Sequence, residues 1–205
     1  GGGQRQSGAD KVLFSLLKDL RKDISRNENL PPFVIFQDPS LEDMTIQYPI
    51  SEDELQQISG VGAGKAAKYG KPFLDLISNY VEENEITRPN DMVIKSVVNK
   101  SGLKVYIIQS IDRKRPLDDI AHSKNLSLDA ALKEIELIVS SGTKLDISYY
   151  IDEKVDEYHQ EEIFDYFAEA ETDSIQDALD ELGEPEFSEE EVRLMRIKFL
   201  SEVGN

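Results

Sequence analysis

Apolar residues recur with the period of an α-helix from residue 12 to residue 24. One face of the predicted helix carries Leu13, Leu16, Leu17, Leu20 and Ile24. Pro31 and Pro32 cannot continue this helix, because proline has no N–H to donate and its ring clashes with the preceding turn. The sequence therefore predicts an amphipathic helix followed by an extended or turn segment.

Short helices are predicted next. Asp38 or Ser40 can cap one of them, and Pro49 ends it. Ser51 and Glu54 have the spacing of a capping box, which predicts a helix start at that point. A glycine-rich run at residues 60–70 then leads into a longer helix.

The pattern from residue 103 to residue 142 predicts a helix-turn-helix. The apolar run at 105–111 fits a helix, although its β-branched residues leave a strand as the alternative. A turn at Asn125 separates a short apolar face from a helix that Ser127 caps and Gly142 ends. Three more helices are expected at about 152–170, 174–182 and 188–202.

These elements predict an all-α protein in two parts. Residues 1–9 are linker-like, and the polar segment around Pro89 suggests a second linker at 85–102. The expected domains are residues 10–84 and residues 103–205. The chain opens on Gly1 without an initiator methionine, and we interpret it as a piece of a longer protein.

Composition removes several classes of site. The sequence contains no cysteine, which excludes disulfides, thiolate metal sites and cysteine nucleophiles. It has no run of about eighteen apolar residues, so no membrane partner is expected. The formal net charge of −18 by itself argues against a basic nucleic-acid binder.

The charge is unevenly distributed along the chain. Residues 1–88 carry 10 basic and 14 acidic side chains, residues 89–144 carry 9 and 7, and residues 145–205 carry 4 and 20. Nearly all the net negative charge therefore lies in residues 145–205. Such an asymmetry indicates that the parts of the chain have different partners.

The glycine-rich run is a candidate phosphate site. A Walker A loop needs glycine at position 59 and a hydroxyl residue after Lys65, but Ser59 and Ala66 stand there. No strand of a dinucleotide-binding unit precedes the run either. What remains is a turn followed by a helix start that can hold a phosphate or simply join two helices. The candidate contacts are Gly60, Gly62, Lys65, Lys68, Tyr69 and Lys71.

The polar face of the first helix is a second candidate surface. Its uniformly basic stripe includes Lys18, Arg21 and Lys22. A stripe of one sign fits contact with phosphates, and the alternative is an ordinary solvated face.

The strings LFSLLKDLRKDI, LPPFVIFQDPSLEDM and SGVGAGKAAKYGKPFLDLI resemble the HRDC domain of RecQ-family helicases across about residues 10–84. The resemblance implies a five-helix bundle that binds single-stranded or branched DNA weakly. It also assigns binding to basic residues of the first helix, to the aromatic residue after the proline pair and to the glycine-lysine turn. The matching residues here are Arg21, Lys22, Phe33, Lys65, Lys68 and Lys71. Phe33 could stack on a base or belong to the core.

Residues 103–202 resemble the helix-turn-helix-like domain at the C terminus of many bacterial RecQ helicases, with or without a wing. The second helix of the motif carries Asp129, Glu134 and Glu136 but only one lysine, so a packed helical unit is favoured over groove reading. Any DNA contact in this part should come from a secondary basic patch, made of Lys104, Arg113, Lys114, Arg115 and Lys124.

The acidic C-terminal part offers no site from its sequence. Residues 152–157 lack the ligand spacing and central glycine of a calcium loop, and no carboxylate pair stands out for acid–base chemistry. His122 is interpreted as a surface polar residue, His159 has no partners of a catalytic triad in evidence, and no metal site is predicted. The acidic part could repel DNA, dock a basic protein partner or fold back on a basic face.

We therefore predict a non-catalytic DNA-binding accessory region, tethered in cis to a RecQ-type helicase core and acting in DNA repair and recombination. No cofactor is expected in this chain, since ATP and magnesium belong to the helicase core. The resemblance implies a bacterial cytoplasmic, nucleoid-associated protein. Two alternatives stay open: a protein-interaction or regulatory module, and the HRDC region of an RNase D-like nuclease.

Overall fold

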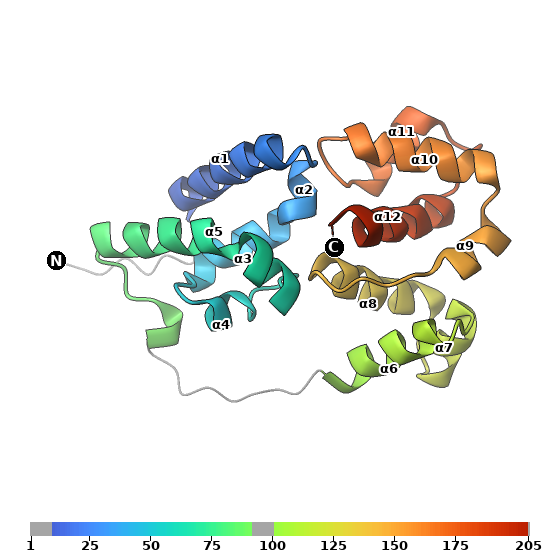
Figure 1. The fold of residues 1–205 in the computed structure, drawn as a ribbon, viewed down its shortest axis with the longest axis horizontal. Coiled ribbons are helices and arrows are strands. Elements are labelled where there is room, and N and C mark those ends of the chain that lie inside the picture. Colours follow the sequence, from blue (N-terminus) through green and yellow to red (C-terminus); the bar gives the residue numbers. More distant parts are fainter. Residues whose placement is uncertain (1–9, 92–100, 205) are drawn as a thin grey trace. The chain divides into compact units, whose positions relative to one another are not determined.

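A computed structural model describes residues 10–91 and 101–204 of the chain. Every regular element in these ranges is a helix, as the all-α prediction required (Figure 1). The chain divides into two compact units, Gly1–Ser96 and Val97–Asn205. Within the described residues, no helix is long and apolar enough to cross a membrane.

The first unit is the predicted five-helix bundle. Its helices are α1 (Lys11–Glu28), α2 (Pro32–Ile35), α3 (Asp38–Gln47), α4 (Glu52–Leu55) and α5 (Ala63–Glu83), followed by the short 3-10 helix η1 (Pro89–Asp91). Asp10 caps α1 by accepting the backbone N–H groups of Val12 and Leu13. Ser51 caps α4 as predicted, whereas α3 begins one residue before Pro39 without a side-chain cap.

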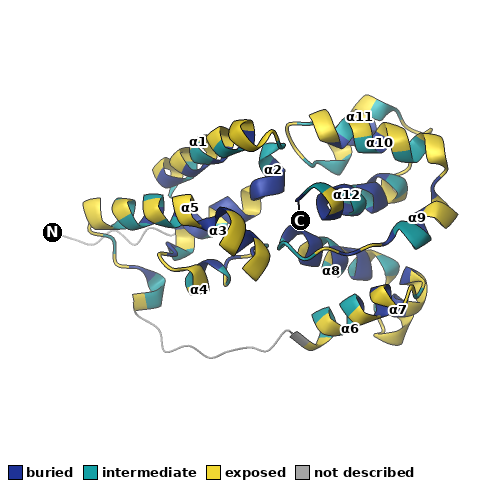
Figure 2. Ribbon diagram, viewed as in Figure 1, coloured by how far each residue is buried: buried dark blue, intermediate teal, exposed yellow. Residues whose placement is uncertain are grey.

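The core of this unit gathers one apolar face from each helix. Leu13 and Leu17 of α1 are fully buried, and the outward side of α1 is exposed (Figure 2). The ring of Phe36 meets the ring of Phe73 edge-on, with 4.9 Å between their centroids. The segment that follows Pro31 and Pro32 thus contributes aromatic side chains to the core, where they pack with residues of α1 and α5.

A partly buried network of tyrosine hydroxyls around Asp10 also stabilises the bundle. The Tyr80 hydroxyl donates to Asp10 Oδ2 over 2.9 Å, and the Tyr48 hydroxyl donates to the same oxygen over 3.1 Å. Burial and the neighbouring Asp10 carboxylate raise the pKa of Tyr48 to about 12. One capping carboxylate therefore ties the start of α1 to the end of α3 and to α5.

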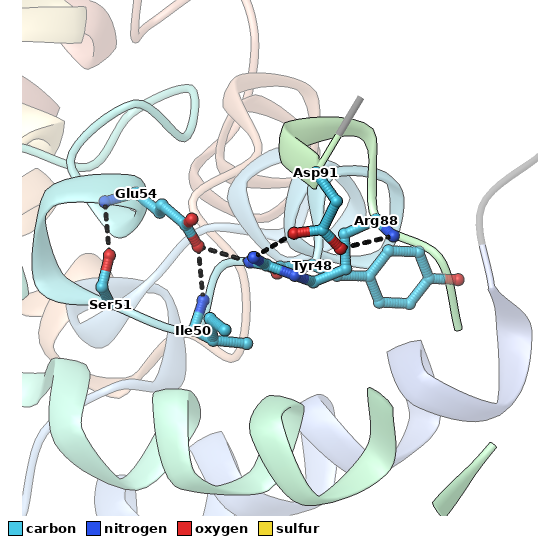
Figure 3. A network of polar contacts seen from close by, with 6 residues as sticks. All are labelled: Tyr48, Ile50, Ser51, Glu54, Arg88 and Asp91. Carbon is cyan, nitrogen blue, oxygen red and sulfur yellow. Dashed lines mark hydrogen bonds and ion pairs between the residues drawn. The ribbon is translucent and has the colours of Figure 1, made fainter. Parts of the chain in front are cut away.

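The first unit continues past residue 84, where the sequence analysis placed a linker. Ile86 packs against the core, and Arg88 is only 7% exposed. Figure 3 shows the Arg88 guanidinium donating to Glu54 Oε2 over 2.6 Å and to Asp91 Oδ1 over 2.8 Å. Burial alone would lower the pKa of Arg88, but its hydrogen bonds with these two carboxylates raise it. The segment to residue 91 is thus fastened to the bundle, and the limits of the linker stay a prediction.

The second unit is built from α6 (Ser101–Asp112), α7 (Leu117–Ser123), α8 (Leu128–Ser140), α9 (Ser148–Lys154), α10 (Glu157–Glu169), α11 (Ile175–Leu182) and α12 (Glu189–Gly204). α7 and α8 form the predicted helix-turn-helix, with Asn125 in the left-handed region at φ 55° and Ser127 as the cap of α8. Residues 105–111 lie in α6, so the strand alternative is wrong. The described residues hold no strand for a wing.

Helix α12 is the centre of the second unit. It contacts α8, α9, α10 and α11, and it is buried along much of its length (Figure 2). Ser188 and Glu191 form a capping box at its start, where the Glu191 N–H donates to Ser188 Oγ and the Ser188 N–H donates to Glu191 Oε2. The local capping signal therefore sets where this central helix begins.

The single helix expected at 152–170 is wrong. Val155 is extended at φ −127° and buried, and it separates α9 from α10. Asp156 then starts a new helix by accepting the His159 N–H over 2.9 Å. The apolar period runs through the break, so periodicity alone could not show it.

Candidate nucleic-acid interface

Helix α1 presents two of its predicted contact residues to solvent. Lys18 and Lys22 are exposed, four positions apart on one face. Arg21 points the other way and is buried. Its Nη1 donates to the Phe36 carbonyl and its Nη2 to Asp38 Oδ1, both over 2.7 Å. As folded, Arg21 holds the α2–α3 segment and does not face solvent.

The glycine turn before α5 is sterically constrained. Gly60 has φ 76°, and a Cβ at this position would lie 2.8 Å from Ser40 Oγ. Ser40 Oγ in turn donates to the Ser59 carbonyl over 2.7 Å. Gly62 then begins α5 without a side-chain cap. The positive φ and the short distance to Ser40 thus require glycine at position 60. The turn leads directly into α5, whose first backbone N–H groups have no side-chain cap.

The lysines of α5 divide into buried and exposed. Lys65 is 2% exposed, whereas Lys68 and Lys71 are exposed and three positions apart. Lys68 Nζ lies 5.1 Å from the centroid of the Tyr69 ring. Lys71 Nζ lies 3.1 Å from Asp75 Oδ2 in a solvated ion pair. Only Lys68 and Lys71 of these three lysines face solvent as folded.

Both candidate stacking residues are buried in the first unit. Phe33 and Tyr69 are each 4% exposed. Tyr69 meets Phe36 edge-on, with 6.4 Å between the ring centroids. Neither ring offers a face to a base without moving, so the core alternative for Phe33 describes its place in the fold.

A cluster in the second unit joins two residues of the secondary basic patch around Tyr106. Arg115 Nη1 donates to the Tyr106 hydroxyl over 2.7 Å, and Lys124 Nζ lies 4.3 Å from the ring centroid. Arg115 Nη2 also donates to Ser123 Oγ over 3.0 Å. Hydrogen bonds from Ser123 and Arg115 lower the pKa of the Tyr106 hydroxyl. We call Tyr106, Arg115, Ser123 and Lys124 the Tyr106 cluster.

The cations of the Tyr106 cluster form no salt bridge with the residues that the structure describes. Across residues 10–91 and 101–204, no carboxylate lies within ion-pair distance of Arg115 or Lys124. The remaining patch residues lie on the same stretch of chain: Lys104 is half-buried on α6, and Arg113 and Lys114 are exposed in the turn after it. The sequence analysis missed Tyr106 and Ser123, because neither is charged and the α6–α7 turn brings them to Arg115.

The second helix of the helix-turn-helix is covered by α12. Arg193 Nη1 donates to Asp129 Oδ1 over 2.6 Å, and its Nε donates to Glu136 Oε1 over 3.1 Å. Arg196 Nη2 lies 3.1 Å from the same Glu136 oxygen. The acidic face of α8 therefore meets arginines of the same chain. This arrangement supports the packed unit rather than a helix that enters the major groove.

Family models match both units. An HRDC domain model matches residues 10–77, and a model for the RecQ-1-like helix-turn-helix domain matches residues 101–151. Residues 10–77 are thus similar to HRDC domains, and residues 101–151 are similar to the RecQ-1-like helix-turn-helix domain. The HRDC model includes α1 to α4 and most of α5, and the helix-turn-helix model ends within α9. Residues 152–205, with 19 of the 41 acidic side chains of the chain, lie beyond both matches.

Similar proteins are helicases. The chain is 44% identical over 79 residues to the ATP-dependent DNA helicase RecQ of Haemophilus influenzae, covering 38% of the chain and 13% of that protein. It is 46% identical over 68 residues to the enzyme of the same name from Bacillus subtilis, covering 33% and 12%. A longer match, 25% identical over 149 residues, relates 66% of the chain to 11% of the bifunctional 3'-5' exonuclease/ATP-dependent helicase WRN of Mus musculus. The chain spans about an eighth of the length of the two bacterial relatives.

Proposed function

We propose that this region binds the backbone of single-stranded or branched DNA weakly, as an accessory part of a RecQ-type DNA helicase. The observation that carries the proposal is the exposure of Lys18, Lys22, Lys68 and Lys71 on the HRDC helices α1 and α5. Lysines on adjoining helices suit contacts with phosphates, which do not depend on base sequence. The uncapped start of α5 beside Lys68 adds backbone N–H groups to the same surface.

Weak binding follows from the number of cations. Four exposed lysines can neutralise only a few phosphates, and each contributes a slope of about −0.7 to the dependence of log affinity on log salt for single strands. The acidic C-terminal residues repel the DNA backbone and confine contact to the basic surfaces. Affinity should therefore fall only moderately with salt and stay low in absolute terms.

The test combines two charge reversals, Lys68→Glu and Lys71→Glu, in the full chain. Both side chains are exposed, so the fold should survive, whereas reversing the buried Lys65 would disturb the core. We expect fluorescence anisotropy with single-stranded and forked DNA to show at least about a tenfold loss of affinity and a shallower salt slope.

A matched control reverses Lys133 and Lys144, which are also exposed and change the net charge equally. This control should lose much less affinity than the Lys68 and Lys71 variant. Equal losses in the two variants would mean that net charge alone governs binding, and an unchanged affinity in the first variant would refute the HRDC surface.

The Tyr106 cluster is proposed as a second phosphate contact. Its support is the convergence of Arg115 and Lys124 on one ring without a carboxylate partner among the described residues. Lys124→Glu should reduce affinity for forked DNA further in the Lys68 and Lys71 background. Arg113→Glu reverses a charge in the turn after α6, outside the Tyr106 cluster. Its effect on the affinity for forked DNA is compared with that of Lys124→Glu.

The whole protein is proposed to be an ATP-dependent helicase that acts in the cytoplasm in DNA repair and recombination. The helicase relatives and the paired domain matches support this assignment over an RNase D-like nuclease. ATP and magnesium would be bound by the helicase core, and this region would tune the choice of DNA. Sequencing upstream of residue 1 tests the proposal, because a helicase core carries a Walker A loop.

A protein-interaction role for the acidic part is a second candidate. Residues 145–205 carry 20 acidic and 4 basic side chains, and Arg193 and Arg196 are already paired within the unit. A basic segment of another protein would complement the remaining charge. Binding of a lysine-rich peptide that is lost on deleting residues 145–205 but kept in the Lys68 and Lys71 variant would support this role.

A further inference from the structure

Three side chains that can bind metal meet at the starts of two helices in the acidic part. His159 Nδ1 lies 2.9 Å from Glu191 Oε1 and 3.5 Å from Asp156 Oδ2. Asp156 and His159 belong to the start of α10, and Glu191 to the first turn of α12. Within the described ranges, this is the one group of three His, Asp or Glu side chains whose ligand atoms all lie within 4.8 Å of one another.

Each carboxylate is held in place through its other oxygen. Asp156 Oδ1 accepts the His159 N–H over 2.9 Å as the cap of α10. Glu191 Oε2 accepts the Ser188 N–H over 2.9 Å and the Ser188 hydroxyl over 3.1 Å in the capping box of α12. The second oxygen of each group faces His159 Nδ1. Fixing one oxygen by hydrogen bonds leaves the other oriented toward a shared point, as in metal sites whose ligands are supported from outside.

The histidine ring is fixed as well. It stacks on Phe187 with 4.3 Å between centroids and 33° between planes, and its side chain is 14% exposed. A pocket of about 490 Å³, lined in part by Glu191, Ser188 and Lys154, opens at the start of α12 and gives solvent access to this region. The ring therefore loses little freedom on binding a ligand.

We propose that Asp156, His159 and Glu191 bind one divalent transition-metal ion, with Zn²⁺ as the representative ion. Ligand atoms around such an ion, at about 2.1 Å from it, lie about 3.0–3.4 Å apart in octahedral or tetrahedral arrangements. The two distances at Nδ1 fall close to this range. One imidazole nitrogen with two carboxylate oxygens suits zinc and its neighbours rather than magnesium or calcium, and water would complete the coordination.

The surrounding charge favours a cation. Glu186 acts on His159 electrostatically in addition to its two partners, and Glu190 lines the adjoining pocket. Lys154, the basic side chain in that pocket, places its Nζ over the Tyr150 ring at 5.4 Å from the centroid. Without a metal, a proton on His159 Nδ1 makes the hydrogen bond to the carboxylates. A metal ion at this nitrogen would replace the proton. Binding should therefore release a proton and weaken in acid.

Metal binding would change the stability of the acidic part. The ligands come from α10 and α12, which are separated in sequence but pack together. An ion that bridges them would stabilise the part of the chain beyond both family matches, independently of DNA binding. The site would make the stability of this acidic part depend on metal supply.

The test is titration of the chelator-treated full chain with Zn²⁺ by isothermal calorimetry. We expect one saturable site, and a weakening of at least about tenfold in His159→Gln. The matched control is His122→Gln, because the sequence contains 2 histidines and His122 is exposed on α7. This control should bind like the wild type. Absence of saturable binding at millimolar Zn²⁺, or equal affinity in the two histidine variants, would overturn the proposal.

A second variant guards against loss of folding in His159→Gln. Asp156→Asn keeps the capping oxygen for the His159 N–H but removes the negative charge on an exposed residue. It should also weaken Zn²⁺ binding. In NMR spectra of the wild type, Zn²⁺ should shift the His159 ring nitrogens and leave those of His122 unchanged. The opposite pattern would place the metal elsewhere, against the proposal.

Discussion

Arginine side chains stabilise the fold in both units, but the charged residues exposed on the surface differ between the two units. In the HRDC unit, Arg21 and Arg88 are buried and hold loop segments by donating to backbone carbonyls and carboxylates. In the second unit, Arg193 and Arg196 lie between α12 and the acidic face of α8. Both sets of arginines stabilise the fold. The difference lies in what stays outside: both lysines and carboxylates on the HRDC helices, and mainly carboxylates on the C-terminal helices.

This difference changes how basic residues should be interpreted. Arginine makes several directed hydrogen bonds and is well suited to buried ion pairs, whereas lysine is strongly hydrated and tends to stay on the surface. The candidate DNA contacts on α1 and α5 that face solvent are all lysines. In the Tyr106 cluster, Arg115 is half-buried. It is therefore intermediate between a buried arginine that stabilises the fold and a lysine that faces solvent.

The largest expected effect is a difference in unfolding free energy between variants of the two arginine arrangements. Arg88→Met leaves Glu54 partly buried without this cation and should cost about 3 kcal/mol of unfolding free energy for the HRDC unit. Arg193→Met should cost less, about 1 kcal/mol, because Glu136 keeps Arg196. Urea unfolding of each variant, followed by probes in each unit, measures both values. Equal costs would contradict the distinction.

A glycine in each unit gives the next contrast. Gly60→Ala places a Cβ 2.8 Å from Ser40 Oγ in a backbone at φ 76°, and should cost about 2 kcal/mol. Gly102→Ala on α6 meets nothing within 4 Å and should stabilise by about 0.5 kcal/mol. Thermal unfolding of the two variants should therefore shift in opposite directions. An upward shift in both variants would mean that the turn tolerates a side chain, and a downward shift in both would contradict the expected gain from Gly102→Ala.

Local signals were readable from the sequence. The caps at Ser51, Ser127 and Ser188 act within three residues of themselves, and the structure places helix starts at each. The HRDC resemblance and the helix-turn-helix pattern supplied the order of helices. The break at Asp156 was missed because an apolar residue, Val155, occupies the extended position and keeps the period intact.

Side-chain direction was not readable in the same way. Arg21 belongs to the basic stripe of α1, yet it turns inward because the Phe36 carbonyl and Asp38 lie within its reach. His159 has Asp156 three positions before it, but Glu191, which completes the group, is 32 positions away in the sequence. Such contacts depend on how distant helices pack, which no local pattern encodes.

A pH dependence should distinguish the acidic part from the HRDC unit. Hydrogen bonding to Glu191 raises the pKa of His159 above its ordinary 6.5, although burial opposes this. The stability from this pair is therefore complete below the ordinary value and is lost as pH rises through the raised one. Burial would raise the pKa of Glu191, but hydrogen bonds from Ser188 and His159 lower it, so its contribution is lost only in stronger acid.

The expected loss between the two ends of this window is below about 1 kcal/mol, since the pair is partly solvated. Thermal unfolding in the presence of a chelator at pH 6 and at pH 8 measures it. His159→Gln should remove the difference from the transition of the second unit. A pH dependence that persists in this variant would have to come from another group.

A hydroxyl deletion within the HRDC core is expected to have little or no destabilising effect. The Tyr69 hydroxyl is buried and has no hydrogen-bond partner among the described residues, so it carries a desolvation cost without compensation. Tyr69→Phe should be neutral or stabilise the unit by up to about 1 kcal/mol, and DNA affinity should not change. Tyr80→Phe is the matched change, because its hydroxyl donates to Asp10, and it should destabilise by about 1.5 kcal/mol. If Tyr69→Phe instead weakened DNA binding at unchanged stability, this hydroxyl would have to reach the DNA by leaving the core, and the lysines would not be the whole of the binding surface.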